Sequence, residues 1–402
     1  MSKPLSVLLV VDSYPPVLGG SEIEAQRVSS AMIRRGHRVE VLCAGGPPMP
    51  ARRAWIDPAG VPVRILTRWT GGRLKDISFA LQTAWILWTD RKKYDVVYFL
   101  MQGLHLAAGL PMGRFLRKPM VMKFGGSGVV PFIRASRVGK WELNWMQQWK
   151  VPVLVLNEGM TQEALADGFS AEQITWMPNP VDVDEFRPAP AEQAAEFRRQ
   201  QRLSPTAVIA TYVGRLSHEK GLPELLRSFA RAVPQCPEAL LLLIGDGAQR
   251  AELEALARTL DLGPGHIRFV GRVDVREVPA WLQASDIFTL LSPNEGFSCA
   301  LLEAMSVGLA SVVTDIPANR QLVEPGVHGL AVPFGDDDRA GDAFTALLTD
   351  PVARQRMGQL ARQRVVENYS MPRVVERYEA LFSKIMRSPS QPALASTSSV
   401  RE

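Results

Sequence analysis

Residues 6–43 read SVLLVVDSYPPVLGGSEIEAQRVSSAMIRRGHRVEVLC, and this stretch decides the fold. It holds an apolar run of strand length at 6–11, an amphipathic run of helix length at 22–36 and a second apolar run at 38–43. A helix pattern between two strand patterns indicates a β-α-β unit. Because the Val/Leu runs are continuous and not alternating, the strands should be covered on both faces. The stretch therefore predicts a parallel sheet between layers of helices.

The same alternation continues along the chain and is interrupted once. Further apolar runs lie at 95–100, 118–124 and 151–156, and a second series begins with AVIATYVGRL at 207–216. The Pro-rich stretch MPNPVDVDEFRPAP, residues 177–190, separates the two series and predicts an interdomain linker. Ligands of doubly wound domains bind at the carboxyl ends of the strands. We therefore expect an α/β protein with two such domains and a ligand between their strand ends.

The predicted domains follow from these breaks. They are 1–180 and 181–369, followed by a helix at 370–387 that crosses back to the first domain and a small, polar, disordered tail at 388–402. A length of 402 residues suits two cores better than one, and 46% hydrophobic with 22% charged residues is typical of folded proteins. The bulk of the chain should therefore be globular.

Composition also bears on compartment and partners. The three cysteines, Cys43, Cys236 and Cys299, are far apart, which favours a reducing cytoplasm, and no apolar run has the length that spans a bilayer. Residues 1–180 carry a net charge of +9 and residues 181–402 a net charge of −4. The basic first half suggests an anionic partner, such as a phospholipid surface at the inner face of the membrane or a phosphorylated acceptor. Charge kept for solubility is the alternative.

The segment NEGFSCALLEAMSVG, residues 294–308, carries the strongest chemical signal. It follows an apolar strand and opens a helix that ends at Gly308, so Glu295 lies in the loop and Glu303 within the helix. The amides of Gly296, Phe297 and Ser298 then lie at a helix N-terminus, which attracts anions. A sugar nucleotide fits this arrangement: its diphosphate faces the amides, its ribose faces Glu303 and its sugar faces Glu295.

The loop GRLSHEKG, residues 214–221, is the second signal, because it follows the strand 207–213 and supplies two cations, Arg215 and Lys220. When a sugar leaves a diphosphate with little help from the nucleophile, negative charge gathers on the phosphate oxygens. Two cations at that point stabilise the leaving group without a metal. The pattern alone is weak, since such loops are often simply solvated.

These segments occur in a specific order. GRLSHEKG, then IGDG, FVGRV and EGFSCALLEAMSVGLA, followed by residues 313–336, resemble the donor-binding domain of family 4 glycosyltransferases, also called glycosyl transferases group 1. The likeness extends to residues 12–42 and covers most of 5–386. It implies a GT-B fold of two Rossmann-like domains facing across a cleft. It also implies that Arg215 and Lys220 hold the diphosphate, with donor contacts from the residues above and from Val273, Gly245, Gly19 and Gly20.

Candidate acceptor residues lie in the first half. The strand at 118–124 contains Lys123 and leads into Gly125 and Gly126, where many relatives carry a histidine that is absent here. His105 is an alternative cleft imidazole, although a core or surface role is equally compatible with its position. The lysine is a further candidate, and the glycines should help to shape an acceptor pocket.

Two other patterns bear on metal and membrane contacts. Asp182 and Asp184 superficially resemble a manganese pair, but they lie in the Pro-rich linker, and no cluster has metal-ligand spacing, so we expect no metal site and no cofactor. Trp141, Trp145 and Trp149 recur every four residues, which favours packing on the first domain's sheet, with contact to a membrane interface as the alternative.

The sequence thus predicts a metal-independent, retaining hexosyltransferase that moves sugar from a UDP- or GDP-linked donor to a hydroxyl acceptor such as a glycan, a lipid-linked sugar or a small metabolite. A nucleotide-sugar epimerase and a non-catalytic sugar-nucleotide-binding subunit remain as alternatives on the same architecture. No pattern suggests nucleic acid as a partner. A dehydrogenase is disfavoured because no Gly-x-Gly-x-x-Gly follows the first strand.

Overall fold

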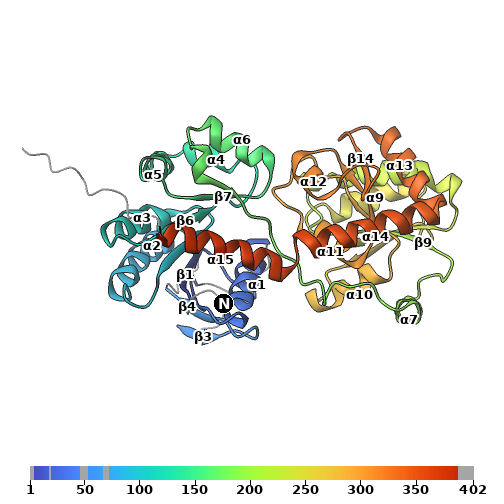
Figure 1. Ribbon diagram of the computed structural model, residues 1–402. Coiled ribbons are helices and arrows are strands. Elements are labelled where there is room, and N and C mark those ends of the chain that lie inside the picture. Colours follow the sequence, from blue (N-terminus) through green and yellow to red (C-terminus); the bar gives the residue numbers. More distant parts are fainter. Residues whose placement is uncertain (1–3, 18–19, 46–52, 67–71, 388–402) are drawn as a thin grey trace, which may run out of the picture. The chain divides into compact units, whose positions relative to one another are not determined.

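The computed structural model describes residues 4–17, 20–45, 53–66 and 72–387 (Figure 1). The predicted tail at 388–402 and the predicted ligand residue Gly19 lie outside these ranges. Contacts divide the chain into two compact units. Of the described residues, those within 4–155, 160–177 and 375–387 form unit 1, and 156–159 and 178–374 form unit 2. The main division at 177/178 is close to the expected boundary at 180/181.

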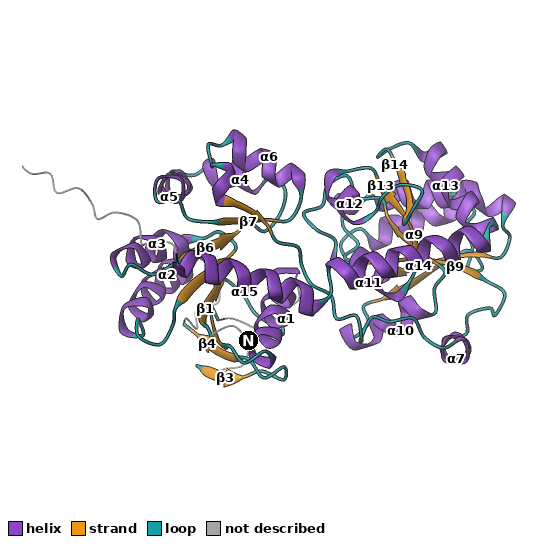
Figure 2. Ribbon diagram, in the orientation of Figure 1, coloured by secondary structure: helices purple, strands orange, loops and turns teal. Residues whose placement is uncertain are grey.

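The sheet of unit 1 is parallel except at one edge. Its order is β3-β4-β2-β1-β5-β6-β7-β8, and only β3 and β4 pair antiparallel among the described strands (Figure 2). The order reverses between β1 and β5, which are neighbours. The strands are β1 (Ser6–Val11), β2 (Arg38–Cys43), β3 (Ala54–Ile56), β4 (Pro62–Ile65), β5 (Val96–Leu100), β6 (Met120–Lys123), β7 (Val153–Val155) and β8 (Ile174–Trp176).

Helices cover this sheet, as its wholly buried central strands require. They are α1 (Gly20–Arg34), α2 (Gly72–Thr89), α3 (Leu104–Phe115), α4 (Val129–Arg134), α5 (Arg137–Gln148), α6 (Glu158–Ala166) and α15 (Met371–Arg387), with a short 3₁₀ turn at Ala171–Gln173. The last helix returns to unit 1: the Tyr378 and Tyr98 hydroxyls hydrogen-bond at 3.0 Å, and Arg35 Nε donates to Glu379 Oε1 at 2.7 Å.

The sheet of unit 2 is parallel throughout the described strands, in the order β11-β10-β9-β12-β13-β14. Numbered within the unit, this is 3-2-1-4-5-6, the doubly wound order in which the two halves diverge from the central pair. The strands are β9 (Val208–Val213), β10 (Ala239–Ile244), β11 (Ile267–Gly271), β12 (Ile287–Leu290), β13 (Ala310–Thr314) and β14 (Gly329–Val332).

The helices of unit 2 alternate with these strands. They are α7 (Ala191–Gln200), α8 (Leu222–Ala232), α9 (Arg250–Thr259), α10 (Val278–Gln283), α11 (Cys299–Val307), α12 (Pro317–Leu322), α13 (Asp337–Thr349) and α14 (Pro351–Asn368), with 3₁₀ turns at His218–Lys220, Val233–Gln235 and Val275–Glu277. The chain from Met177 to Pro190 holds neither helix nor strand, as the Pro-rich pattern predicted.

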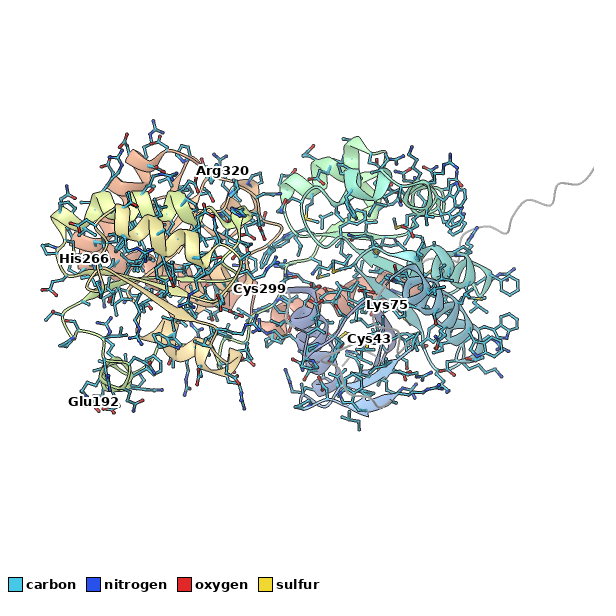
Figure 3. The ribbon with its side chains drawn as sticks, turned by 180° about the vertical axis from the view of Figure 1, so that it is seen from behind. Cys43, Lys75, Glu192, His266, Cys299 and Arg320 are labelled. Atoms are coloured by element: carbon cyan, nitrogen blue, oxygen red, sulfur yellow. The ribbon has the colours of Figure 1, made fainter. Side chains whose placement is uncertain are left out.

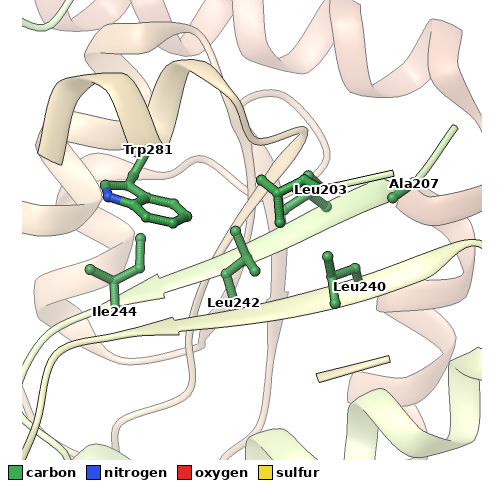
Figure 4. Close-up of a cluster of buried hydrophobic side chains, with 7 residues drawn as sticks. Leu203, Ala207, Leu240, Leu242, Ile244 and Trp281 are labelled. Carbon is green, nitrogen blue, oxygen red and sulfur yellow. The ribbon is translucent and has the colours of Figure 1, made fainter. Parts of the chain in front are cut away.

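One of the cores of unit 2 shows how helix and sheet meet. Leu240, Leu242 and Ile244 of β10 project toward Trp281 of α10, together with Leu203 (Figure 4). Alternate residues of β10 supply this cluster because successive side chains point to opposite faces. The whole strand is buried, so its remaining leucines pack on the other face of the sheet. The α/β architecture predicted from residues 6–43 is therefore confirmed in both units.

The predicted core packing of the tryptophan series is wrong for Trp141, whereas Trp145 and Trp149 are half-buried. The buried face of α5 is formed by Gly139, Glu142, Leu143 and Met146, whereas Trp141 is 58% exposed. Trp145 and Trp149 stack on each other with ring centroids 5.5 Å apart. The four-residue spacing predicted one buried face, but the fully buried face of α5 is formed by other residues.

Candidate functional site

The candidate site lies where the strand order of unit 2 reverses. Strands β9 and β12 are neighbours there, and their connections run to α8 and α11. Such a reversal leaves a crevice beyond the carboxyl ends of the two strands, which is where α/β proteins bind ligands. Lys220 follows β9, and Glu295 follows β12. The topology therefore brings together two loops that the sequence singled out separately.

Lys220 and Glu295 form an ion pair in this crevice. Lys220 Nζ lies 2.8 Å from Glu295 Oε1, and Ser292 Oγ donates to the same oxygen at 2.7 Å. The two charged side chains are only 21% and 10% exposed, so the attraction is screened less than at an open surface. A cation and a carboxylate with different predicted roles therefore meet at one point.

Glycines allow the neighbouring backbones to approach closely. Gly221, at φ +62°, would place a Cβ 2.1 Å from the Leu291 carbonyl oxygen, and a Cβ on Gly245, at φ +136°, would lie 1.9 Å from the Gly214 carbonyl oxygen. Side chains at these positions would push the loops apart. The Gly245 amide donates to the Gly271 carbonyl at 2.8 Å, so this predicted donor-binding residue shapes the loops, and its amide is already used.

Arg215 is placed differently from its predicted partner Lys220. Its side chain is 78% exposed and its guanidinium lies 3.4 Å from Glu219 in the same loop. Its carbonyl accepts a hydrogen bond from the Tyr212 hydroxyl at 2.8 Å. Burial raises the pKa of Tyr212, so this hydroxyl stays a donor and holds the loop. Of the two predicted cations, Lys220 therefore contacts Glu295, whereas Arg215 lies at the solvent edge.

Helix α11 begins and ends where the sequence predicted. Ser298 is its N-cap and accepts from the Leu301 amide at 3.2 Å, and Gly308 ends it in a left-handed conformation at φ +93°. Phe297 is buried, and its ring centroid lies 6.1 Å from that of Tyr369. Since Ser298 satisfies a first-turn amide, the helix is fixed at its N-terminus with its positive end beside Glu295 and Gly296.

Glu303 is half-buried on α11, four residues after Cys299 and therefore on the same helical face. Cys299, in the first turn of α11, is labelled in Figure 3 and accepts a hydrogen bond from Asn179 Nδ2 at 3.6 Å. Val273 follows β11 and is partly buried against the cluster around Trp281. A contact from Val273 to a nucleotide base would consequently come from its backbone.

Three residues of the site lacked a signal in the sequence. Ser292 and Tyr212 orient Glu295 and the Arg215 loop, and Asn157 Nδ2 donates to the Gly296 carbonyl at 2.6 Å. Ser292 and Asn157 each follow an apolar run, whereas Tyr212 lies inside β9. For Ser292 and Asn157, a polar residue directly after a predicted strand was the available clue, but such residues are too common to be selective.

The predicted first-half residues have mixed placements. Lys123 on β6 is 1% exposed, and its ammonium donates to Glu24 and lies 3.5 Å from the Tyr378 hydroxyl. The idea that Lys123 projects toward a ligand is thus wrong for this structure. Burial of two opposite charges is tolerated because each satisfies the other.

His105 is also a core residue and not an exposed imidazole. It is 2% exposed, with ring centroids 5.1 Å from Phe79 and 6.4 Å from Phe99. Burial lowers its pKa to about 4, so the imidazole is neutral at physiological pH. A catalytic role for it would require access that the described structure does not provide.

The structure does not test whether the predicted glycines of unit 1 contact a ligand. Gly20 begins α1 after β1, and no atom lies within 4 Å of the position that a Cβ would take there. Gly125 and Gly126 follow β6 and are at least partly exposed. The Gly128 amide donates to the Glu163 carboxylate at 2.8 and 2.9 Å, which ties this loop to α6. Their predicted acceptor role remains a prediction.

Asp182 forms a turn by accepting from the amides of Asp184 and Glu185 at 3.0 and 3.1 Å. Within the ranges that the structure describes, no group of three or more His, Cys, Asp or Glu side chains is placed to hold a metal ion.

Comparison with known proteins identifies the family. Residues 193–364 match the model of "Glycosyl transferases group 1", and residues 18–185 match that of "Glycosyltransferase Family 4". The two matches adjoin each other and together span both units. The chain belongs to the family 4 glycosyltransferases.

Curated relatives agree with this assignment. The chain is 26% identical to glycogen synthase of Mycobacterium tuberculosis over 96% of its length and 97% of that protein. It is 28% identical to phosphatidyl-myo-inositol mannosyltransferase of Mycobacterium leprae over 94% and 97%. Other matches are partial. The chain is 27% identical to N-acetyl-alpha-D-glucosaminyl L-malate synthase of Bacillus anthracis, and this match spans about half of that relative, 49% of its length.

Solved structures show the same GT-B fold. HepE of Anabaena, crystallised with UDP, has a TM-score of 0.79 at 18% identity and covers 94% of this chain and 100% of its own. A glycosyltransferase of Rickettsia africae has a TM-score of 0.79 at 16% identity over 96% and 100%. The predicted fold class, including a C-terminal helix that returns to the first domain, is confirmed.

Proposed function

We propose that this glycosyltransferase transfers a hexose, with retention of configuration, from a UDP- or GDP-linked donor to a hydroxyl acceptor. The observation that carries the proposal is the Lys220–Glu295 pair at the β9–β12 reversal, beside the N-terminus of α11. Relatives support the donor class: one is named a GDP-mannose-dependent mannosyltransferase, and HepE was crystallised with UDP-glucose. The sugar and the base for this chain are part of the proposal.

Donor binding would divide the Lys220–Glu295 pair between two parts of the substrate. The ammonium of Lys220 and the positive end of α11 suit the diphosphate, whereas the Glu295 carboxylate suits hydroxyl groups of the sugar. Glu303, farther along α11, suits the vicinal hydroxyls of the ribose. Arg215, at the exposed edge of the same loop, would add a second cation after a change of side-chain rotamer.

Retention follows from a same-face substitution. The bond between the anomeric carbon and the diphosphate oxygen breaks, the acceptor oxygen bonds to the same face, and the acceptor proton passes to the departing diphosphate oxygen. Cations at the leaving group stabilise the negative charge that develops there. We propose that Lys220 and Arg215 perform this task without a metal ion and that no other cofactor takes part.

The acceptor is proposed to bind unit 1 at the carboxyl ends of β1, β5 and β6, where Gly20, Gly125 and Gly126 lie. The basic first half of the chain also supports peripheral association with an anionic membrane as a further proposal. Within the described ranges, no helix is both long enough and apolar enough to cross a bilayer.

Thermal unfolding with a panel of UDP- and GDP-sugars tests the donor assignment. A ligand that binds the native state raises the apparent Tm, so one donor should stabilise the wild type and have a much smaller effect on Lys220→Ala and Glu303→Ala. Arg202→Ala, an exposed arginine elsewhere in unit 2, is the matched control and should respond like wild type. Equal stabilisation of all four proteins would contradict the assignment of donor binding to Lys220 and Glu303.

Product analysis tests the chemistry. With the donor so identified and a set of hydroxyl acceptors, NMR of the product should show the anomeric configuration of the donor. Inversion would refute retention, and donor converted without an acceptor-linked product would indicate an epimerase. Activity that survives exhaustive chelation supports the metal-independent proposal, whereas loss restored by Mn²⁺ or Mg²⁺ overturns it.

A further inference from the structure

Helix α2 of unit 1 is apolar on both of its faces. Phe79, Ala80, Ile86 and Leu87 are buried, as expected for a helix packed on α3. The opposite side nevertheless carries a stripe of exposed apolar side chains at helical spacing: Leu74, Ile77, Leu81, Trp85 and Trp88. Leu81 and Trp85 are 66% and 67% exposed. A surface helix normally presents polar residues there, so the stripe indicates a binding face.

The stripe continues onto α3, which lies alongside α2 (Figure 1). Phe115, at the end of α3, is 70% exposed and stacks on Trp88 with ring centroids 5.8 Å apart. We call the five α2 residues together with Phe115 the apolar face. Lys75 of α2, labelled in Figure 3, lies beside this face and pairs with Asp12 at 3.7 Å.

Basic residues border the apolar face at the end of α2. Arg91, Lys92 and Lys93 follow the helix after one intervening residue, Asp90. The Arg91 guanidinium lies 5.1 Å from the centroid of the Trp88 ring, and Lys93 is 69% exposed although it pairs with Asp90. An indole with a cation above it, next to exposed leucines, is a combination suited to the headgroup region of a bilayer.

A basic cavity adjoins the same edge. It has a volume of about 520 Å³, and it lies at the amino ends of β6, β7 and β8, opposite the strand ends where an acceptor is proposed. Five cationic side chains and one carboxylate, Glu172, line it; the cations are Arg114, Arg117, Lys118, Lys150 and Lys384. Arg114 and Arg117, which line the cavity, flank Phe115 of the apolar face in the chain, so the cavity and the apolar face both reach the end of α3.

Two of these cations lack a local counter-charge. Arg117 and Lys150 are exposed, and among the described residues neither forms an ion pair. The helix ends nearby are C-termini, whose carbonyls offset part of the positive charge. The side-chain excess of four positive charges around a single cavity is larger than this offset, so an anionic occupant is favoured.

We propose that the apolar face and the basic cavity together dock unit 1 on an anionic phospholipid bilayer. The apolar face enters the boundary between headgroups and acyl chains, and the cavity receives a lipid phosphate. A second copy of this chain is a poorer occupant, because an isologous contact would bring two copies of the same basic border into one interface. The inference does not depend on glycosyl transfer.

Co-sedimentation of the full chain with vesicles tests the proposal. Binding is expected to vesicles that contain phosphatidylglycerol and to be much weaker with phosphatidylcholine alone. The double variant Leu81→Glu/Trp85→Glu should reduce binding at least about tenfold, because two charges would enter the bilayer boundary. Arg117→Ala/Lys150→Ala should reduce it about fivefold for each charge removed.

Matched controls come from unit 2. Val352→Glu/Val366→Glu changes two exposed apolar residues, and Arg202→Ala/Arg258→Ala removes two exposed cations. Both controls should bind vesicles like wild type, and all variants should keep the wild-type Tm because the altered side chains are exposed. Equal binding to both kinds of vesicle, or equal losses in the controls, overturns the proposal.

A second copy of the chain on the apolar face would give a different experimental result. If the apolar face joins two copies of the chain, light scattering will show a wild-type dimer that Leu81→Glu/Trp85→Glu dissociates, with no binding to anionic vesicles. That outcome rejects the membrane proposal. Stabilisation by inorganic phosphate without vesicle binding would likewise reduce the cavity to a site for a soluble anion.

Discussion

Lys220 Nζ lies 2.8 Å from Glu295 Oε1, although the two residues are 75 positions apart in the chain. The pair is held by Ser292 on one side and by the Gly221 turn on the other. Each charge keeps the other in place at the strand ends of unit 2. In the proposed mechanism, a ligand with both phosphates and hydroxyls replaces this contact. If the donor binds here as proposed, such preorganisation lowers the cost of assembling the site.

The first prediction concerns this pair. Lys220→Met and Glu295→Gln should each lower kcat/KM for sugar transfer by about 100- to 1000-fold, because in the proposed mechanism each side chain contacts the reacting part of the donor. The double variant should lose much less than the product of the single losses, since the two groups act as a unit. Steady-state kinetics of the wild type and all three variants complete this double-mutant cycle. Strictly multiplicative losses would show that the residues work independently.

The second prediction concerns the backbone contact at Gly245. Gly245→Ala should lower the free energy of unfolding by more than about 2 kcal/mol, because a Cβ would lie 1.9 Å from the Gly214 carbonyl oxygen and φ is +136°. Gly263→Ala is the control, since no atom lies within 4 Å of its Cβ position. Urea denaturation measures both. Similar stability of the two variants would show that the β9 and β10 loops are not locked together.

The third prediction separates structure from function at Lys123. Lys123→Met should cost about 3–5 kcal/mol of stability, because it leaves the buried Glu24 carboxylate without its cation. Lys123→Met/Glu24→Gln should recover part of this loss, since no unpaired charge remains. The folded fraction of either variant should keep its KM for the acceptor. A raised acceptor KM in the double variant, with stability recovered, would restore Lys123 as a ligand contact.

The fourth prediction is a pH dependence at Glu142. Burial raises the pKa of this carboxyl to about 7 from an unfolded value near 4.5, so the group destabilises the fold as it ionises. The stability that the protonated Glu142 carboxyl contributes is complete below pH 4.5 and is lost as the pH rises through 7. Glu142→Gln should therefore match wild type in acid and exceed its stability by about 3 kcal/mol above pH 7. Urea titrations across this range provide the measurement, and a gap independent of pH would contradict the assignment.

Local patterns were sufficient for much of the fold. The apolar runs at 6–11 and 207–213 became β1 and β9, and α11 begins after Ser298 and ends at Gly308 as expected. Strand length, helical period and capping chemistry depend on residues a few positions apart, so they can be read in order along the chain. The family likeness then narrowed the candidate site to the loops after β9 and β12.

The pairing of charged residues and the burial of side chains depended on the tertiary structure. Lys123 and Glu24, 99 positions apart, became a buried pair, and His105 became a core residue between two aromatic rings. Trp141 of α5 is exposed although the spacing favoured a buried position. The apolar face of α2 could not be recognised in the sequence, because an apolar helix has the same pattern whether or not a partner covers it.

What the sequence by itself determined is therefore the order of strands and helices, their ends, and the chemical character of the loops that follow them. Only the tertiary structure decided which charges meet, as Lys220 and Glu295 do, and which apolar surface is left uncovered on α2. The physical reason is that propensity and capping act within a few residues, whereas burial and charge pairing depend on which distant strands become neighbours in the sheet.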